Sequence, residues 1–151
     1  MISILSLFEI KTKQPRFIIH EHHADKAKLH YDIRLEKDSV LKSWATRKLP
    51  DLLDNKVTKI QLFPTPDHDM SWINFGVNKK NIKNINPEKY IIKDGYGKGT
   101  VFIYDIGTYD LIEWTDNKIT VNFYGNIING FFTFILYKDN TYLLIKHKEK
   151  K

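Results

Sequence analysis

Short stretches in which apolar and polar residues alternate follow one another along most of the chain. The clearest alternation runs through Leu29–Glu36, where every second residue is apolar. A period of two is typical of a β-strand, whose successive side chains point to opposite faces. This pattern, or an enrichment in β-branched and aromatic residues, predicts strands at Arg16–His20, Leu29–Glu36, Val40–Thr46, Val57–Phe63, Thr100–Asp105, Thr108–Trp114, Ile119–Tyr124, Phe131–Tyr137 and Tyr142–Lys146.

Turn-forming residues separate several of these strands, and Ile106-Gly107 is expected to be one such turn. The segment Asn78–Lys89 is rich in Asn and Lys, which predicts an exposed loop. Only Met1–Glu9 has a pattern compatible with a short helix. Many short strands favour an all-β barrel or sandwich. We therefore predict an all-β fold, a single small β-barrel over residues 16–151, preceded by a short N-terminal helix or arm at residues 1–15.

Composition narrows the class of protein. The 151 residues contain no cysteine, which excludes disulfides and thiolate chemistry. No apolar run has the length of a membrane span, and Met1–Ile10 lacks the features of a signal peptide, so we expect a soluble cytoplasmic protein. A net charge of +6 and a pI near 9.3 favour a polyanionic partner, most commonly nucleic acid.

The strand Leu29–Glu36 is expected to present two contrasting faces. One face is apolar and should meet the core with Leu29, Tyr31, Ile33 and Leu35. The other face is polar and carries, at intervals of about 6–7 Å, the side chains of His30, Asp32, Arg34 and Glu36. Such a row could hold a metal ion together with an anion bound to it.

Two imidazoles and one carboxylate suit a divalent ion such as Mn, Fe or Zn. His30 and Asp32 would come from the strand itself, and either His22 or His23 would be folded back by a bulge or loop at Ala24–Lys28. The alternative is an ordinary polar strand face beside a solvated His-rich turn. The crowding of three further histidines close to His30 favours a site.

Two more residues carry candidate chemistry. Arg34 could clamp a phosphate or carboxylate through two hydrogen bonds, or could simply pair with Glu36 or Asp32. His68 follows Pro64-Thr65-Pro66-Asp67, interpreted as a rigid loop, where it could act as an acid or phosphate donor or merely stabilise a turn.

Several segments resemble, in order, the DNA ligase D 3′-phosphoesterase family. The two most specific blocks are Arg16-Phe17-Ile18-Ile19-His20-Glu21-His22-His23-Ala24 and Leu29-His30-Tyr31-Asp32-Ile33-Arg34-Leu35-Glu36. The match continues with Val40–Ala45, Asp67-His68, Gly95–Val101, Tyr104–Tyr109 and Leu143–His147. The resemblance thus extends from about Arg16 to the C-terminus.

The resemblance implies a small β-barrel that removes a 3′-terminal ribonucleoside and then the 3′-phosphate from DNA or DNA/RNA ends in a manganese-dependent reaction. Other divalent transition metals are compatible with it. A separate DNA ligase and polymerase or primase would be partners. The resemblance implies that the metal ligands are His22, His30 and Asp32. It assigns the phosphate to Arg34 and Lys48, and contact with the scissile phosphate to His68 as donor or general acid.

The chain also departs from this family. Pro66 stands where an acidic residue is usual, Trp72 replaces a tyrosine, and a basic position has at best Lys59 nearby. These departures are the best support for a rival interpretation, a non-catalytic basic barrel that binds nucleic acid. An iron oxygenase is a second rival, because His30, Asp32 and a distant histidine imitate its ligand set. The chain is short for that fold and lacks its Arg-x-Ser signature.

Overall fold

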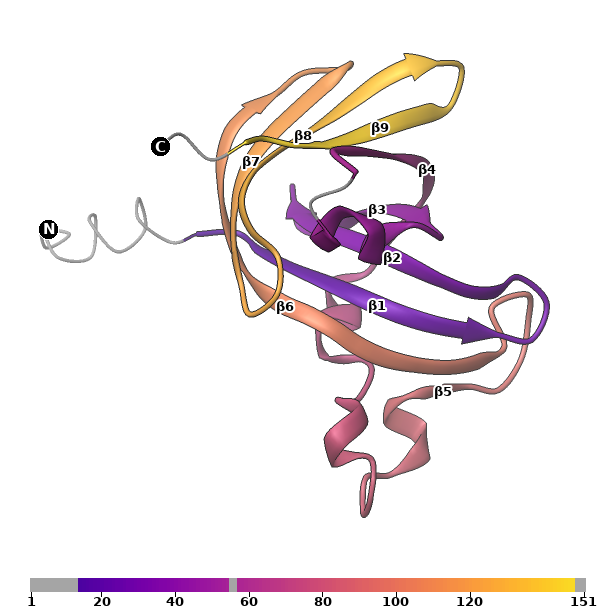
Figure 1. Cartoon of the computed structure of the whole chain (residues 1–151). Coiled ribbons are helices and arrows are strands. Elements are labelled where there is room, and N and C mark those ends of the chain that lie inside the picture. The colour runs from indigo at the N-terminus through magenta and orange to yellow at the C-terminus, as the bar shows by residue number, and fades with distance from the viewer. Residues whose placement is uncertain (1–13, 55–56, 149–151) are drawn as a thin grey trace, which may run out of the picture.

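The computed structural model describes residues 14–54 and 57–148 (Figure 1). Within these residues the chain forms nine strands, β1 (Arg16–Ala24), β2 (Lys28–Lys37), β3 (Val40–Thr46), β4 (Lys59–His68), β5 (Ile91–Ile92), β6 (Gly99–Trp114), β7 (Lys118–Gly125), β8 (Asn129–Lys138) and β9 (Thr141–Lys146). Four 3-10 turns accompany them, η1 (Leu49–Asp54), η2 (Met70–Asn74), η3 (Lys79–Asn81) and η4 (Pro87–Lys89).

Eight of the strands close an antiparallel barrel in the order β1-β2-β3-β4-β9-β8-β7-β6, because β6 also pairs with β1. β5 pairs with β6 outside this ring. The predicted all-β barrel is therefore confirmed. The helix expected within Met1–Glu9 lies outside the described residues, and the boundary after residue 15 stays a prediction. The described residues form no helix long and apolar enough to cross a membrane.

The inside of the barrel is one hydrophobic cluster. It receives side chains from all eight barrel strands and from η1, among them Phe17, Ile33, Trp44, Leu52, Leu62, Tyr109, Phe123, Phe134 and Leu144. Burial of this apolar surface stabilises the closed sheet. The interior therefore contains packed side chains, and a ligand must bind elsewhere.

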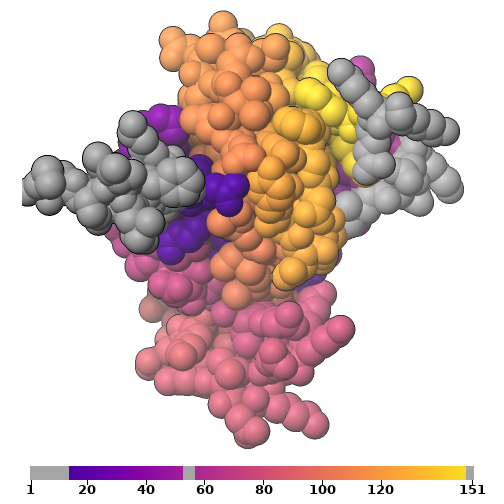
Figure 2. Space-filling view, turned by 90° about the vertical axis from the view of Figure 1, so that its left-hand side faces the viewer, coloured from indigo at the N-terminus to yellow at the C-terminus, as the bar shows by residue number. Residues whose placement is uncertain are grey.

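The outer face of β1–β3 carries a second, smaller cluster. Ile18 and Leu41 pack there against Ile73, with Met70 and Trp72 partly buried beside them. This contact holds η2 against the outside of the barrel. The segment from η2 to β5 then projects away from the strands, as the lobe at the bottom of Figure 2 shows. Its part Asn78–Lys89 is largely exposed, as predicted, and contains η3 and η4.

The two strands predicted at Thr100–Asp105 and Thr108–Trp114 are one strand, β6, so the turn predicted at Ile106-Gly107 is wrong. Gly107 pairs with Gly125 of β7, and a Cβ there would lie 2.1 Å from the backbone oxygen of Tyr124. The glycine thus permits a close approach of two strands instead of reversing the chain.

Three other details differ from the prediction. β1 continues past His20 to Ala24 because β2 and β6 both pair with it up to that residue, so no loop needs to fold His22 back. β4 includes Pro64–His68, which was predicted as a loop. Among the described strands only β3 pairs with that half of β4, which leaves its other edge unpaired by them, and prolines are tolerated at such an edge. Leu29 is 42% exposed, because it lies at the end of β2 beyond the core.

Candidate metal and phosphate site

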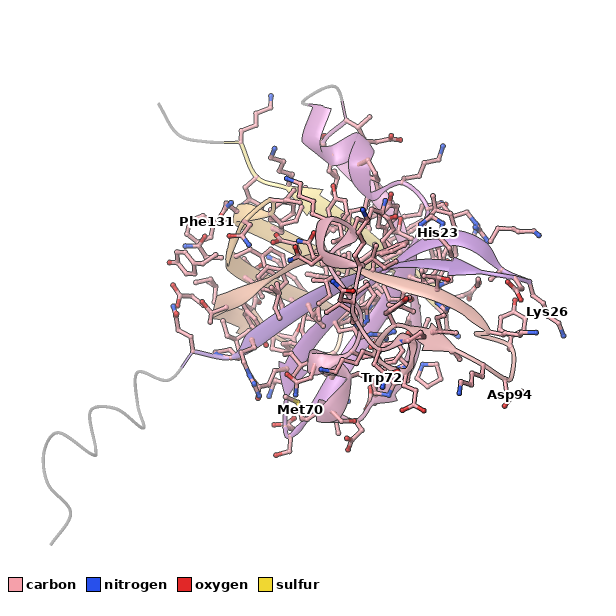
Figure 3. The ribbon with its side chains drawn as sticks, turned by 90° about the horizontal axis from the view of Figure 1, so that it is seen from below. His23, Lys26, Met70, Trp72, Asp94 and Phe131 are labelled. Carbon is pink, nitrogen blue, oxygen red and sulfur yellow. The ribbon has the colours of Figure 1, made fainter. Side chains whose placement is uncertain are left out.

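A cavity of about 630 Å³ lies on the outer face of β1–β4, between these strands, η2 and the turn before β6. All six residues singled out in the sequence line it, namely His22, His30, Asp32, Arg34, Lys48 and His68. Trp72 of η2, labelled in Figure 3, lies on its wall. Lys59 is not among the lining residues, so the suggested basic substitute does not reach the site.

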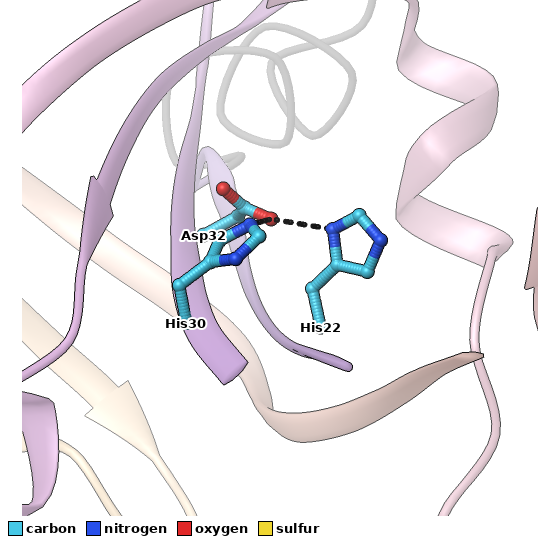
Figure 4. A group of neighbouring side chains, drawn as sticks. All are labelled: His22, His30 and Asp32. Carbon is cyan, nitrogen blue, oxygen red and sulfur yellow. Dashed lines mark ion pairs between the residues drawn. The ribbon is translucent and has the colours of Figure 1, made fainter. Parts of the chain in front are cut away.

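Three candidate metal ligands meet at one point of the cavity (Figure 4). His22 and His30 are paired across β1 and β2, and their rings lie 4.7 Å apart. Oδ2 of Asp32 lies 3.6 Å from Nδ1 of His22 and 3.3 Å from Nε2 of His30. The structure thus places His22 beside Asp32, whereas Nε2 of His23 contacts Oε2 of Glu21 at 2.6 Å.

Backbone carbonyls orient both imidazoles. Nε2 of His22 lies 2.7 Å from the oxygen of Gly97, and Nδ1 of His30 lies 3.0 Å from the oxygen of Lys28. Each of these nitrogens can donate to its carbonyl, so the other ring nitrogen, Nδ1 of His22 or Nε2 of His30, faces Asp32. That second nitrogen donates to the carboxylate when the ring is protonated and offers a lone pair to a metal ion when the ring is neutral. Carbonyl partners of this kind are typical behind metal-binding histidines.

The separation of these atoms fits a small divalent cation. Metal–ligand bonds of 2.0–2.2 Å place neighbouring ligand atoms roughly 3–3.5 Å apart, close to the two distances measured from Asp32. Burial alone would raise the pKa of Asp32, but hydrogen bonds with His22 and His30 and the charge of Arg34 hold it well below its usual range. The carboxylate is therefore ionised, as a metal ligand must be.

Arg34 extends the site along β2. It is 4% exposed, and its Nε donates to Nδ1 of His20 at 3.1 Å, while its Nη1 donates to Oγ of Ser43 at 2.9 Å. Nη2 lies 3.5 Å from Oδ2 of Asp32. Its Cζ lies 5.6 Å from the centre of the Trp72 ring. Trp72, where the resemblance leads us to expect a tyrosine, therefore packs against the guanidinium, although it offers no hydroxyl.

His68 and Lys48 lie on the cavity wall beyond Arg34. Nδ1 of His68 is 2.9 Å from the oxygen of Pro66 and 3.2 Å from Nη1 of Arg34, so each neutral tautomer satisfies one of these contacts. Burial, followed by the charge of Arg34, lowers the pKa of His68. The side chain of Lys48 is exposed at the cavity mouth. Glu36 instead pairs with Arg16, away from the cavity.

Sequence reasoning gave no role to His20. Its Nε2 donates to the oxygen of Phe75 at 2.8 Å, and its Nδ1 accepts from Arg34. Burial, and then the charge of Arg34, lowers the pKa of His20 to about 4. The only signal in the sequence was its even spacing from His22. The donor on β2, Arg34, and the carbonyl of Phe75 after η2 become visible only in the folded chain.

Comparison with known proteins identifies the family of the chain. A family model described as the DNA Ligase D 3′-phosphoesterase domain matches residues 20–136. A multifunctional non-homologous end joining DNA repair protein, LigD, of Mycobacterium tuberculosis is 34% identical over 139 residues, which cover 89% of this chain and 16% of that protein.

Two further relatives carry the name multifunctional non-homologous end joining protein LigD. The protein of Mycolicibacterium smegmatis is 31% identical over 148 residues, covering 90% of this chain and 17% of the relative. That of Pseudomonas aeruginosa is 34% identical over 98 residues, covering 65% of this chain and 10% of the relative. The chain thus spans less than a fifth of the length of these relatives.

Proposed function

Because the chain belongs to the family of DNA ligase D 3′-phosphoesterase domains, we propose that it hydrolyses phosphoesters at the 3′ ends of DNA during end joining. The proposed substrates are ends that carry a terminal ribonucleoside or a 3′-phosphate. The observation that carries the proposal is the cluster of His22, His30 and Asp32 beside the buried guanidinium of Arg34 in one cavity. The proposed cofactor is Mn²⁺, held by these three ligands.

The bound cation would supply Lewis-acid polarisation of a phosphate oxygen. Arg34 would neutralise the other phosphate oxygens, and its hydrogen bonds to His20 and Ser43 would hold the guanidinium ready in place. Lys48 at the mouth would add a second positive charge. A preoriented charge of this kind stabilises the transition state without reorganisation during the reaction.

His68 would donate a hydrogen bond to the phosphate or to the leaving oxygen. Its lowered pKa means that the imidazole is neutral in the free protein at neutral pH, and a neutral imidazole still carries one N–H. In hydrolysis of a terminal nucleoside, water would attack phosphorus, and the bond from phosphorus to the 5′ oxygen of that nucleoside would break. The oxygen takes up a proton, and a 3′-phosphate remains.

A gel assay tests the proposal directly. Two labelled primer-templates, one ending in a single ribonucleotide and the other in a 3′-phosphate, are incubated with the protein in Mn²⁺ or in EDTA. Conversion to a 3′-phosphate and then to a 3′-hydroxyl, in Mn²⁺ alone, is the expected result. Salt-sensitive binding with no conversion of either end would overturn the proposal in favour of a non-catalytic nucleic-acid-binding barrel.

A 3′-hydroxyl is the end that a polymerase extends and a ligase seals. We therefore propose that a separate DNA ligase and a polymerase or primase act on the same ends. The relatives come from bacteria, whose DNA lies in the cytoplasm, and we propose the same location for this protein. Pull-down of such enzymes with the tagged full chain, with and without DNA ends, tests the partnership.

A further inference from the structure

One row of paired residues crosses four strands beneath the cavity. His20 of β1 is paired with Asp32 of β2, Asp32 with Ala45 of β3, and Ala45 with Phe63 of β4. All four side chains line the cavity, so they point to the same face of the sheet. At the usual spacing of about 4.8 Å between strands, Phe63 lies roughly 10 Å from Asp32.

The small side chain in the middle of this row leaves space. Ala45 separates the metal-ligating carboxylate of Asp32 from the ring of Phe63 without filling the interval. The cavity of about 630 Å³ is within the range that accepts a small organic ligand. If a phosphate is held near Asp32, the sugar of the same nucleotide fits over Ala45 and its base reaches the ring of Phe63.

Phe63 is a large aromatic residue whose side chain is 51% exposed at the wall of the cavity. The neighbouring wall position on β4 is Thr65, a polar residue. An exposed ring beside a polar wall residue suits a ligand with both a flat apolar face and polar edges. A nucleoside has this combination.

The opposite side of the cavity could bind the rest of the nucleic-acid chain. Tyr96, 73% exposed, lies in the turn before β6, directly before the glycine whose oxygen orients His22. That turn touches the β1–β2 hairpin, since the backbone nitrogen of Asp25 donates to the oxygen of Lys98. Figure 3 shows Lys26 and Asp94 together at these tips. The exposed lysines of the two tips, 26, 28, 93 and 98, outnumber the acidic residues 25 and 94, which favours a phosphate backbone here.

We propose that Phe63 is a specificity-determining residue on which the base of the 3′-terminal nucleoside stacks, an inference that rests on the proposed function. The nucleic-acid chain then leaves the cavity past Tyr96 and the lysines of the hairpin tips. Stacking on an aromatic ring is tolerant of base identity and worth about 5- to 100-fold in binding. A 3′-phosphate end has lost the terminal base, so it makes no use of Phe63.

The test compares two substrates and three variants of the full chain. Phe63→Ala should lower the ratio of kcat/KM for ribonucleoside ends to kcat/KM for 3′-phosphate ends by about 5- to 100-fold. Phe63→Trp keeps a stacking surface and should preserve the ratio. Phe131→Ala is the matched control, because Phe131 is 46% exposed on β8 and lies outside the cavity, well away from Trp72 in Figure 3.

A substrate that ends in an abasic ribose completes the test. The wild-type protein should cleave it less efficiently than the normal end by the same factor, and Phe63→Ala should cause no further loss on it. An unchanged ratio for Phe63→Ala, or equal cleavage of abasic and normal ends, would overturn the inference.

Fluorescence separates this inference from the proposed function. The fluorescence of a 3′-terminal 2-aminopurine nucleoside should fall when the DNA end binds the protein. The decrease should be smaller with the Phe63→Ala variant than with the Phe131→Ala variant. If the wild-type protein cleaves neither end, the proposed function fails, yet the quenching still decides whether Phe63 stacks on a terminal base. Equal quenching by both variants overturns the stacking.

Discussion

Nε of Arg34 donates a hydrogen bond to Nδ1 of His20 across 3.1 Å, and both side chains are almost completely buried. A guanidinium is always protonated, so it fixes Nδ1 of His20 as the acceptor and Nε2 as the donor to Phe75. The imidazole of His20 therefore fixes the position of the Arg34 side chain. Its two hydrogen bonds connect β1 with β2 and with Phe75, the residue after η2. His20 is a positioning residue, and Arg34 is the group presented to the cavity.

This pair makes the protein sensitive to acid. Burial, and then the charge of Arg34, lowers the pKa of His20 from 6.5 to about 4. Between these pH values the unfolded chain binds a proton at residue 20 that the folded chain does not, so the free energy of unfolding falls as the pH falls. At 1.36 kcal/mol per pKa unit, His20 accounts for a loss of about 3 kcal/mol. Urea unfolding in EDTA across this window measures the slope.

His20→Gln removes this titration and should flatten the pH dependence by the same amount. His30 contributes with the opposite sign, because its hydrogen bond to Asp32 raises its pKa, but that contribution is common to both proteins. Identical slopes for the wild type and His20→Gln would show that His20 is not buried as a neutral group.

Metal binding should depend on His30 and not on His23. His30→Ala removes a ligand whose Nε2 faces Asp32, so bound Mn²⁺ and activity should be lost together. His23 lies in the same histidine-rich segment but contacts Glu21, and His23→Ala should keep both. Titration calorimetry with Mn²⁺ and the gel assay provide the two readouts. Retention of stoichiometric Mn²⁺ by His30→Ala would contradict the ligand assignment.

Arg34→Lys should reduce turnover while the metal stays bound. Lysine keeps the charge but not the planar fork that reaches His20 and Ser43 together. We expect kcat/KM on a 3′-phosphate end to fall by about 10²–10³. Arg16→Lys is the matched control, since Arg16 pairs with Glu36 outside the cavity. Equal rates for the two variants would remove Arg34 from the proposed phosphate clamp.

Stability of the barrel should depend on Asp105, independently of metal. Its carboxylate is 3% exposed and accepts backbone hydrogen bonds from Asn126, Ile127 and Ile128 between β7 and β8. Asp105→Ala leaves these donors without their charged acceptor and should cost about 3 kcal/mol or more. Asp110→Ala, at a carboxylate on the surface that accepts from Tyr124, should cost much less. Urea midpoints of both variants check this difference.

The alternation of apolar and polar residues determined much of this protein. In β2 it sends Tyr31 and Ile33 into the barrel and Asp32 and Arg34 to the outer face, because successive side chains of any strand alternate. The number of short strands likewise determined the all-β class. The alternation within β2 and the number of short strands are local properties, so both can be predicted from the sequence alone.

The tertiary structure decided which groups meet. The register of β1 on β2 places His22 beside His30 and Asp32, and the oxygen of Gly97, 75 residues away in the sequence, orients its ring. The cross-strand row that ends at Phe63 likewise needs three pairings between separate strands. Register depends on hydrogen bonds and packing between distant segments, and a one-residue shift would turn every side chain to the other face. The alternation therefore predicted which polar side chains share one face of β2. Only the folded structure determined which residues of other strands lie next to them.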